Sequence, residues 1–146
     1  MARLHLAVIG CGRLGRACGE TILRSDDLHL AGFVRRSESL GQGMPSALAE
    51  VPTAADLQAL GTINAALVCV PAEKVAERVH NLVQHGVPLV ECAASPTAAG
   101  DTWHEKLHRL AERHHVSAVT GAGWSPGRSI ASAGSSPCWC PRGGKR

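Results

Sequence analysis

Gly10-Cys11-Gly12-Arg13-Leu14-Gly15 stands between an apolar run at residues 4–9 and a segment in which apolar residues have helical spacing. Its glycines have the G-x-G-x-x-G spacing found where a strand turns into a helix that binds a dinucleotide. Gly10 permits a sharp turn, Gly12 permits the backbone to approach a pyrophosphate, and Gly15 permits the helix to pack closely on the strand. The helix N-terminus offers unpaired N–H groups and a positive dipole end to phosphates. The stretch therefore predicts a nucleotide-binding turn.

The residues that follow complete a strand–helix–strand unit and indicate which nucleotide binds. Residues 28–34 predict a second strand, after which come Arg35, Arg36 and Ser37. A site that prefers NAD usually carries Asp or Glu here, because a carboxylate accepts hydrogen bonds from the ribose 2′-OH. Guanidinium groups and a hydroxyl suit a 2′-phosphate instead. We therefore expect NADP as the cofactor, with a solvated basic turn as the alternative reading.

Strands and helices continue to alternate along the chain. Apolar runs predict further strands at 47–51, 65–70, 87–92 and 116–120, and periodic segments predict helices at 54–60, 72–85 and 99–114. This alternation predicts an α/β fold with a doubly wound parallel sheet of the Rossmann type. A ligand would lie at the carboxyl ends of the strands, where the strand order reverses. The segments expected on that rim, beside the glycine turn, are Cys69-Val70-Pro71, Ala93-Ala94-Ser95 and residues 121–127.

The composition excludes several classes of protein. The 146 residues suit one domain, and 45% hydrophobic with 18% charged residues is typical of a globular chain. The net charge of +3 is modest and aromatic residues make up only 3%, which argues against nucleic acid as a partner. No stretch is long and apolar enough to span a membrane, and no signal peptide is recognisable. We therefore expect a cytoplasmic location and no membrane partner.

Two patterns suggest metal or disulfide chemistry, and both are weak. The six cysteines include a Cys138-Trp139-Cys140 pair without a second pair, so we expect free thiols and no zinc. His104-Glu105-Lys106-Leu107-His108 has the H-E-x-x-H spacing of zinc hydrolases, with His114 at a possible third-ligand position. Ala111 stands where that pattern needs a helix-ending glycine, so a solvated outer helix is the favoured reading and zinc hydrolysis a remote alternative.

The pattern changes near the end of the chain. Residues 128–146 contain one large aliphatic residue, Ile130, among Ser, Gly, Pro, Cys and Arg, which predicts an irregular, disordered tail. The expected organisation is a nucleotide-binding domain at 1–127, a tail at 128–146 and no separate substrate domain. A truncated or frame-shifted chain after about Gly127 is a second interpretation.

Three segments resemble the meso-diaminopimelate dehydrogenase family. They are residues 7–16 (AVIGCGRLGR), residues 33–36 (FVRR) and residues 121–127 (GAGWSPG), the last being similar to the family's Gly-Trp-Asp-Pro-Gly segment. The resemblance covers residues 1 to about 127. It implies NADP-dependent oxidative deamination at the D-configured centre of an amino acid, yielding a keto acid and ammonia, and it is compatible with a homodimer.

The resemblance also implies roles for individual residues. Gly10, Gly12, Arg13, Leu14 and Gly15 would hold the pyrophosphate; Arg35 and Arg36, with Ser37, the 2′-phosphate; Cys69, Val70 and Pro71 the ribose; and Trp124 and Ser125 the substrate. The catalytic residue is not identified.

Several positions depart from the related sequences. Ser125 replaces the family's Asp, Ala93-Ala94-Ser95 replaces an acidic loop, and Glu91-Cys92-Ala93 lacks the Lys of the Glu-Lys-Pro found in wider sugar and amino-acid oxidoreductases. A module that binds NADP without turnover is therefore the alternative function.

Overall fold

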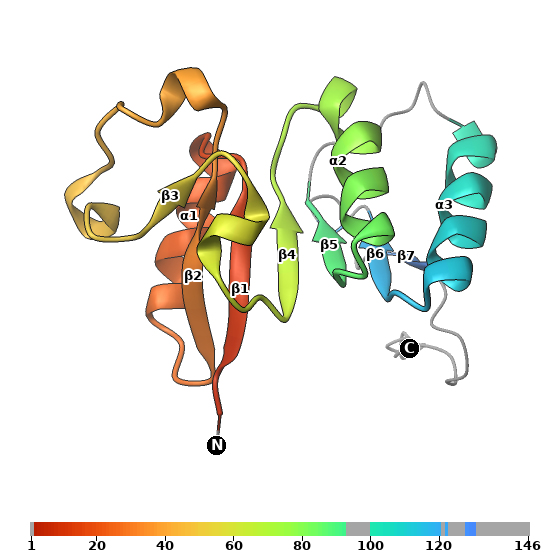
Figure 1. Cartoon of the computed structure of the whole chain (residues 1–146), viewed down its shortest axis with the longest axis horizontal. Helices are drawn as coiled ribbons and strands as arrows, with labels where there is room; N and C mark the ends of the chain where they lie inside the picture. The colour runs from red at the N-terminus through yellow and green to blue at the C-terminus, as the bar shows by residue number, and fades with distance from the viewer. Residues whose placement is uncertain (1, 93–99, 121, 123–127, 131–146) are drawn as a thin grey trace, which may run out of the picture.

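The computed structural model describes residues 2–92, 100–120, 122 and 128–130. Its core is a seven-stranded sheet in the order β3-β2-β1-β4-β5-β6-β7, shown in Figure 1. The strands are β1 Leu4–Ile9, β2 Leu28–Val34, β3 Thr53–Ala54, β4 Ala65–Val68, β5 Leu89–Glu91, β6 Ala118–Thr120 and β7 Arg128–Ile130. The α-helices are α1 Arg13–Leu23, α2 Ala72–Gln84 and α3 Gly100–His114. Three 3-10 helices lie between β2 and β4: η1 Ser37–Ser39, η2 Ser46–Leu48 and η3 Leu57–Leu60.

The sheet confirms the predicted doubly wound Rossmann-type fold. Strands β1 to β6 pair in parallel, and the strand order reverses between β1 and β4. Loops that follow β1, β2 and β4 therefore leave the sheet along one edge, because the carboxyl ends of parallel strands meet there. The first two strands have the bounds that their apolar runs predicted.

Helices cover both faces of the sheet and divide the core in two. On one face Val8, Leu30 and Phe33 pack with Ile22 of α1, and on the other Val68 and Leu89 pack with buried residues of α2 and α3. Figure 1 shows α1 behind β1 and β2, with α2 and α3 on the opposite side. No helix in the described ranges has the length and apolar character needed to cross a membrane.

The connection between β2 and β4 differs from the prediction. The apolar run 47–51 is not a strand: Ser46–Leu48 forms η2 after Pro45, whose φ of −52° begins a turn, and Leu48 is buried. The third strand is the two-residue β3, and the helix predicted at 54–60 is the shorter η3. The physical reason is that only Thr53 and Ala54 reach β2, pairing with Phe33 and Val34.

The beginning of the predicted tail also belongs to the sheet. β7 pairs antiparallel with β6, and Ile130 lies opposite Ala118. This strand pairs with the main-chain edge of β6 that would otherwise be exposed. The sequence did not indicate a strand here because the segment is poor in apolar residues. The prediction of irregular structure from residue 128 was therefore wrong for 128–130, and residues 131–146 lie outside the described part.

Candidate dinucleotide-binding site

Two glycines of the turn are required by the backbone around them. Gly10 has φ +100°, its N–H donates to the carbonyl of Val34 at 2.9 Å, and a Cβ there would overlap the carbonyl oxygen of Cys69. A Cβ at Gly15 would overlap the carbonyl oxygen of Gly10. These contacts bring the first turn of α1 against the end of β1, as the sequence predicted for Gly15.

Gly12 is different, because nothing in the described part of the chain requires a glycine there. It is the N-cap of α1 with φ −76° and ψ −168°, which any residue adopts, and a Cβ at Gly12 would meet no atom within 4 Å. Among the residues that the structure describes no side chain caps this helix, and its first turn holds no acidic residue. Gly12, Arg13 and Leu14 are exposed. The open space and the free helix N-terminus fit a pyrophosphate.

Arg16 stabilises the glycine turn, a role that the sequence analysis did not predict. Its Nε donates to the carbonyl of Cys11 at 3.1 Å, and its N–H donates to the carbonyl of Gly12 at 3.0 Å. The thiol of Cys11 in turn contacts the sulfur of Met44 at 3.2 Å. The sequence could have indicated this role of Arg16, because it lies one helical turn after Gly12 and its side chain can reach back to the carbonyls of the turn.

The two arginines after β2 have different environments. Arg35 is only 7% exposed, and its Nη1 donates to the carbonyl of Gln42 at 3.0 Å, so it holds the loop that follows β2. Arg36 and Ser37 are exposed at the start of η1. Within the described ranges the Nε of Arg35 is buried without a hydrogen-bond partner. Of the predicted phosphate ligands, Arg36 and Ser37 are therefore open to solvent, while Arg35 is mostly covered.

The segment after β4 joins this rim. The N–H of Cys69 donates to the carbonyl of Ile9 at 2.8 Å, which ties the end of β4 to the end of β1. Cys69 is buried, Val70 is half-buried, and the exposed Pro71 is the N-cap of α2. The structure thus brings Cys69-Val70-Pro71 beside the glycine turn. Trp124 and Ser125 lie outside the described residues, as do Ala93-Ala94-Ser95.

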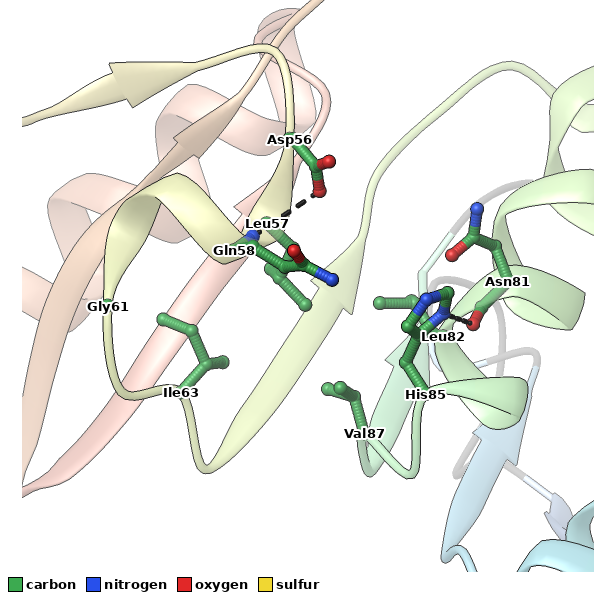
Figure 2. Close-up of a pocket in the computed structure, with 9 residues that line it drawn as sticks. All are labelled: Asp56, Leu57, Gln58, Gly61, Ile63, Asn81, Leu82, His85 and Val87. Carbon is green, nitrogen blue, oxygen red and sulfur yellow. Dashed lines mark hydrogen bonds between the residues drawn. The ribbon is translucent and has the colours of Figure 1, made fainter.

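Two adjoining cavities lie between η3 and α2. The smaller, about 170 Å³, is lined by Ile9 and Val34, the last residues of β1 and β2, together with Arg78 of α2. The larger, about 300 Å³, shares Asp56, Leu57, Asn81 and Leu82 with it. Figure 2 shows the larger cavity with η3 on one side and α2 on the other, extending toward Ile63 and Val87. The pair forms a groove that begins beside the carboxyl ends of β1 and β2.

The histidine motif belongs to an outer helix. α3 runs through Ala111 to His114, so the helix continues where a zinc hydrolase needs it to end. Nε2 of His108 lies 3.3 Å from Oε1 of Glu112 on the same helix. In the portion of the chain that the structure describes, no three His, Cys, Asp or Glu side chains gather as metal ligands.

Comparisons with known proteins agree with this geometry. A model of the Gfo/Idh/MocA family, described as an oxidoreductase family with an NAD-binding Rossmann fold, matches residues 4–121. The meso-diaminopimelate D-dehydrogenase of Bacteroides fragilis is 27% identical over 127 residues, which cover 87% of this chain and 42% of that protein. The chain thus spans less than half the length of this relative.

Solved structures show the same fold at low identity. GenD2 from gentamicin A biosynthesis, in complex with NAD, superposes with a TM-score of 0.68 at 19% identity, covering 83% of this chain and 35% of that one. A dihydrodipicolinate reductase from Paenisporosarcina sp. TG-14 gives 0.64 at 18% identity, covering 81% and 46%. The family match covers the strands β1 to β6, the three α-helices and the glycine turn described above. The chain therefore belongs to the Gfo/Idh/MocA oxidoreductases and contains their NAD(P)-binding Rossmann fold.

Proposed function

We propose that this domain binds NADP and serves a dehydrogenase that oxidises the amine-bearing carbon of an amino acid. One observation carries the cofactor assignment: Arg36 and Ser37 are exposed directly after β2, beside the glycine turn, where a domain that prefers NAD carries an acid. A guanidinium and a hydroxyl both donate hydrogen bonds to a 2′-phosphate, whereas a carboxylate only accepts them and repels the phosphate charge.

Other parts of the nucleotide would contact different segments along the same rim. The N–H groups at Gly12, Arg13 and Leu14, at the start of α1, would receive the pyrophosphate, and the absence of a Cβ at Gly12 leaves room for it. The groove that begins at Ile9 and Val34 offers an apolar floor for the adenine. NADP⁺, when bound, supplies the acceptor for a hydride from the substrate carbon.

The amino-acid substrate is proposed from the relative and from the resemblance of its motifs. The Bacteroides fragilis protein is a meso-diaminopimelate D-dehydrogenase, and the match covers 87% of this chain. Removal of a hydride from the D-configured α-carbon and of a proton from its amine would leave an imine, which water converts to a keto acid and ammonia. Trp124 and Ser125 are the residues proposed to face the substrate, with Ser125 contributing a neutral hydroxyl in place of a carboxylate.

A thermal-shift titration with NADP⁺ and NAD⁺ in parallel tests the cofactor. A ligand at a hundred times its dissociation constant adds about 2.7 kcal/mol to the free energy of unfolding. We expect NADP⁺ to stabilise the protein more than NAD⁺ does. Arg36→Ala should remove that preference, weakening NADP⁺ by about tenfold or more through the loss of a charged hydrogen bond of about 1.5–3 kcal/mol.

Arg24→Ala is the matched control, because Arg24 is an exposed arginine at the far end of α1 whose one ion pair, with Glu20, spans 3.6 Å at the surface. It should leave both nucleotide titrations unchanged. Equal stabilisation by the two nucleotides in the parent protein, or an unchanged preference in Arg36→Ala, would refute the 2′-phosphate site. Arg35→Ala is less informative, because it also releases the loop held at Gln42.

Binding without turnover is the second candidate, favoured by Cys92 at the place where the Glu-Lys-Pro of wider relatives has its catalytic Lys. Formation of NADPH from NADP⁺ and meso-diaminopimelate, followed by absorbance, distinguishes the two. Activity supports the dehydrogenase, whereas a protein that NADP⁺ stabilises but that forms no NADPH supports the binding module.

A further inference from the structure

Three thiols from distant parts of the sequence meet below the rim. Cys18 lies on α1, Cys69 follows β4 and Cys92 follows β5. The thiol of Cys69 points to the Sγ of Cys18 at 4.0 Å, and the thiols of Cys69 and Cys92 are close enough to shift each other's pKa. Within the described residues all three are free thiols. The contacts of Cys69 with the glycine turn are made by its main chain, and the binding site described above assigns no function to the three thiol groups.

The sheet register places Cys69 and Cys92 side by side. The last paired residues of β4 and β5 are Val68 and Glu91, and the N–H of Cys92 donates to the carbonyl of Val68 at 2.9 Å. Cys69 and Cys92 therefore occupy the next positions on neighbouring strands, on the face that α1 covers. Neighbouring strands lie about 4.8 Å apart, within the Cα separation of about 4.4–6.8 Å that a disulfide requires.

The three thiols differ in reactivity. A hydrogen bond from the Cys69 thiol to the Cys92 thiolate lowers the pKa of Cys92, against the opposing effects of burial and the charge of Glu91. The same hydrogen bond, with burial, raises the pKa of Cys69, and burial raises the pKa of Cys18. Cys92 is half-buried, whereas Cys69 is 9% exposed. Because the thiolate is the nucleophile, Cys92 is the member of the cluster that reacts first with an oxidant.

We propose that Cys92 and Cys69 form a peroxide-reactive dithiol that closes to a disulfide. The Cys92 sulfur attacks one oxygen of a hydroperoxide, the O–O bond breaks, and the thiol becomes a sulfenic acid as the peroxide is reduced to water or an alcohol. The Cys69 sulfur then attacks Cys92 Sγ, the S–O bond breaks, and the oxygen leaves with the Cys69 proton as water. Two thiols are oxidised for each peroxide reduced.

Tryptic peptides identify the pair in the full chain. Cleavage after Arg and Lys places Cys69 in peptide 37–74, Cys92 in 79–106, Cys18 in 17–24, and both Cys138 and Cys140 in 129–142. The protein is treated with hydrogen peroxide, its remaining thiols are alkylated, and the digest is read by mass spectrometry before and after a dithiol reductant. We expect peptides 37–74 and 79–106 to be joined, lighter by two hydrogen atoms than their sum, and separated by the reductant.

Variants assign the roles of the two thiols. In Cys69→Ala, peroxide should convert Cys92 to a sulfenic acid that dimedone captures, and peptide 37–74 should no longer be joined to peptide 79–106. Cys92→Ala should slow peroxide-dependent thiol loss in peptide 37–74 by at least about tenfold, because a protonated thiol is a poor nucleophile. Cys18→Ala is the matched control from the same cluster, and should leave the joined peptides unchanged.

Other outcomes overturn the proposal. A Cys18–Cys69 link, joined peptides that persist in Cys92→Ala, or retention of all thiols in peptides 37–74 and 79–106 at a peroxide concentration that oxidises peptide 129–142 would each contradict it. The wild-type digest needs no substitution, so an unstable variant does not obscure the result. The measurement requires no nucleotide, and it is therefore independent of the proposed function.

Discussion

Gly12→Ala should separate the binding role of the glycine turn from its folding role. The backbone of Gly12, with φ −76° and ψ −168°, accepts an alanine, and the added Cβ would meet no atom within 4 Å. Alanine is a poorer N-cap than glycine by about 0.5 kcal/mol, whereas loss of a glycine stabilises by about 0.4–1 kcal/mol through the unfolded chain. These contributions nearly cancel, so the free energy of unfolding should change by less than about 0.5 kcal/mol.

The same methyl group should interfere with the ligand. It would occupy the open space at the N-terminus of α1, where the pyrophosphate is proposed to approach the N–H groups. We expect NADP⁺ to bind at least about tenfold more weakly, a loss of about 1.4 kcal/mol. Calorimetric titration measures the affinity, and thermal unfolding without ligand measures the stability.

Gly15→Ala is the matched comparison within the same turn. Its Cβ would overlap the carbonyl oxygen of Gly10, which is a backbone atom and cannot move away as the end of a flexible side chain can. Overpacking of this kind costs about 1–3 kcal/mol, or a fall in Tm of about 3–10 °C for a chain of this size. Wild-type affinity in Gly12→Ala, or a loss of stability equal to that of Gly15→Ala, would refute the distinction between the two glycines.

Three further predictions concern stability. Gly19→Ala should lower the free energy of unfolding by about 1–3 kcal/mol in urea titrations, because its Cβ would overlap Cζ of Phe33. Arg35→Met should lower it by about 1–2 kcal/mol and speed proteolysis of the loop after β2, since the carbonyl of Gln42 loses its donor. Burial raises the pKa of Cys18 above its ordinary 9.0, so the unfolded chain loses that proton first. Stability should therefore be full below about pH 9 and fall above it, less steeply in Cys18→Ala.

The glycine turn and the first two strands could be predicted because local sequence determines them. An apolar run, a G-x-G-x-x-G turn and a second apolar run specify a parallel strand pair with one crossover helix. Gly86 marked the end of α2 correctly, with φ +72°. α3 has no such signal: after it comes His115, a non-glycine residue with φ +54°, so the sequence could not indicate this left-handed residue.

Features that depend on contacts between distant segments could not be predicted. Arg35 and Arg36 are the same residue type in adjacent positions, and only the path of the loop to Gln42 makes one buried and leaves the other exposed. From the sequence alone the cysteines were expected to be free thiols, and nothing in it indicated that three of them lie together. Cys18 and Cys69 meet across 51 positions in sequence because β1 and β4 are neighbours and α1 lies over them.

The strand order explains why the nucleotide turn and the thiol cluster adjoin each other. Because the sheet reverses between β1 and β4, the first residue after β4 lies beside the turn that follows β1, and β5 lies on its other side. Cys69 is that residue. Its main chain bonds to Ile9 and limits Gly10 to glycine, while its side chain contacts the neighbouring thiols. Since the first role needs only the backbone, the side chain at this position is free to carry separate chemistry, and the two proposals can fail or succeed independently.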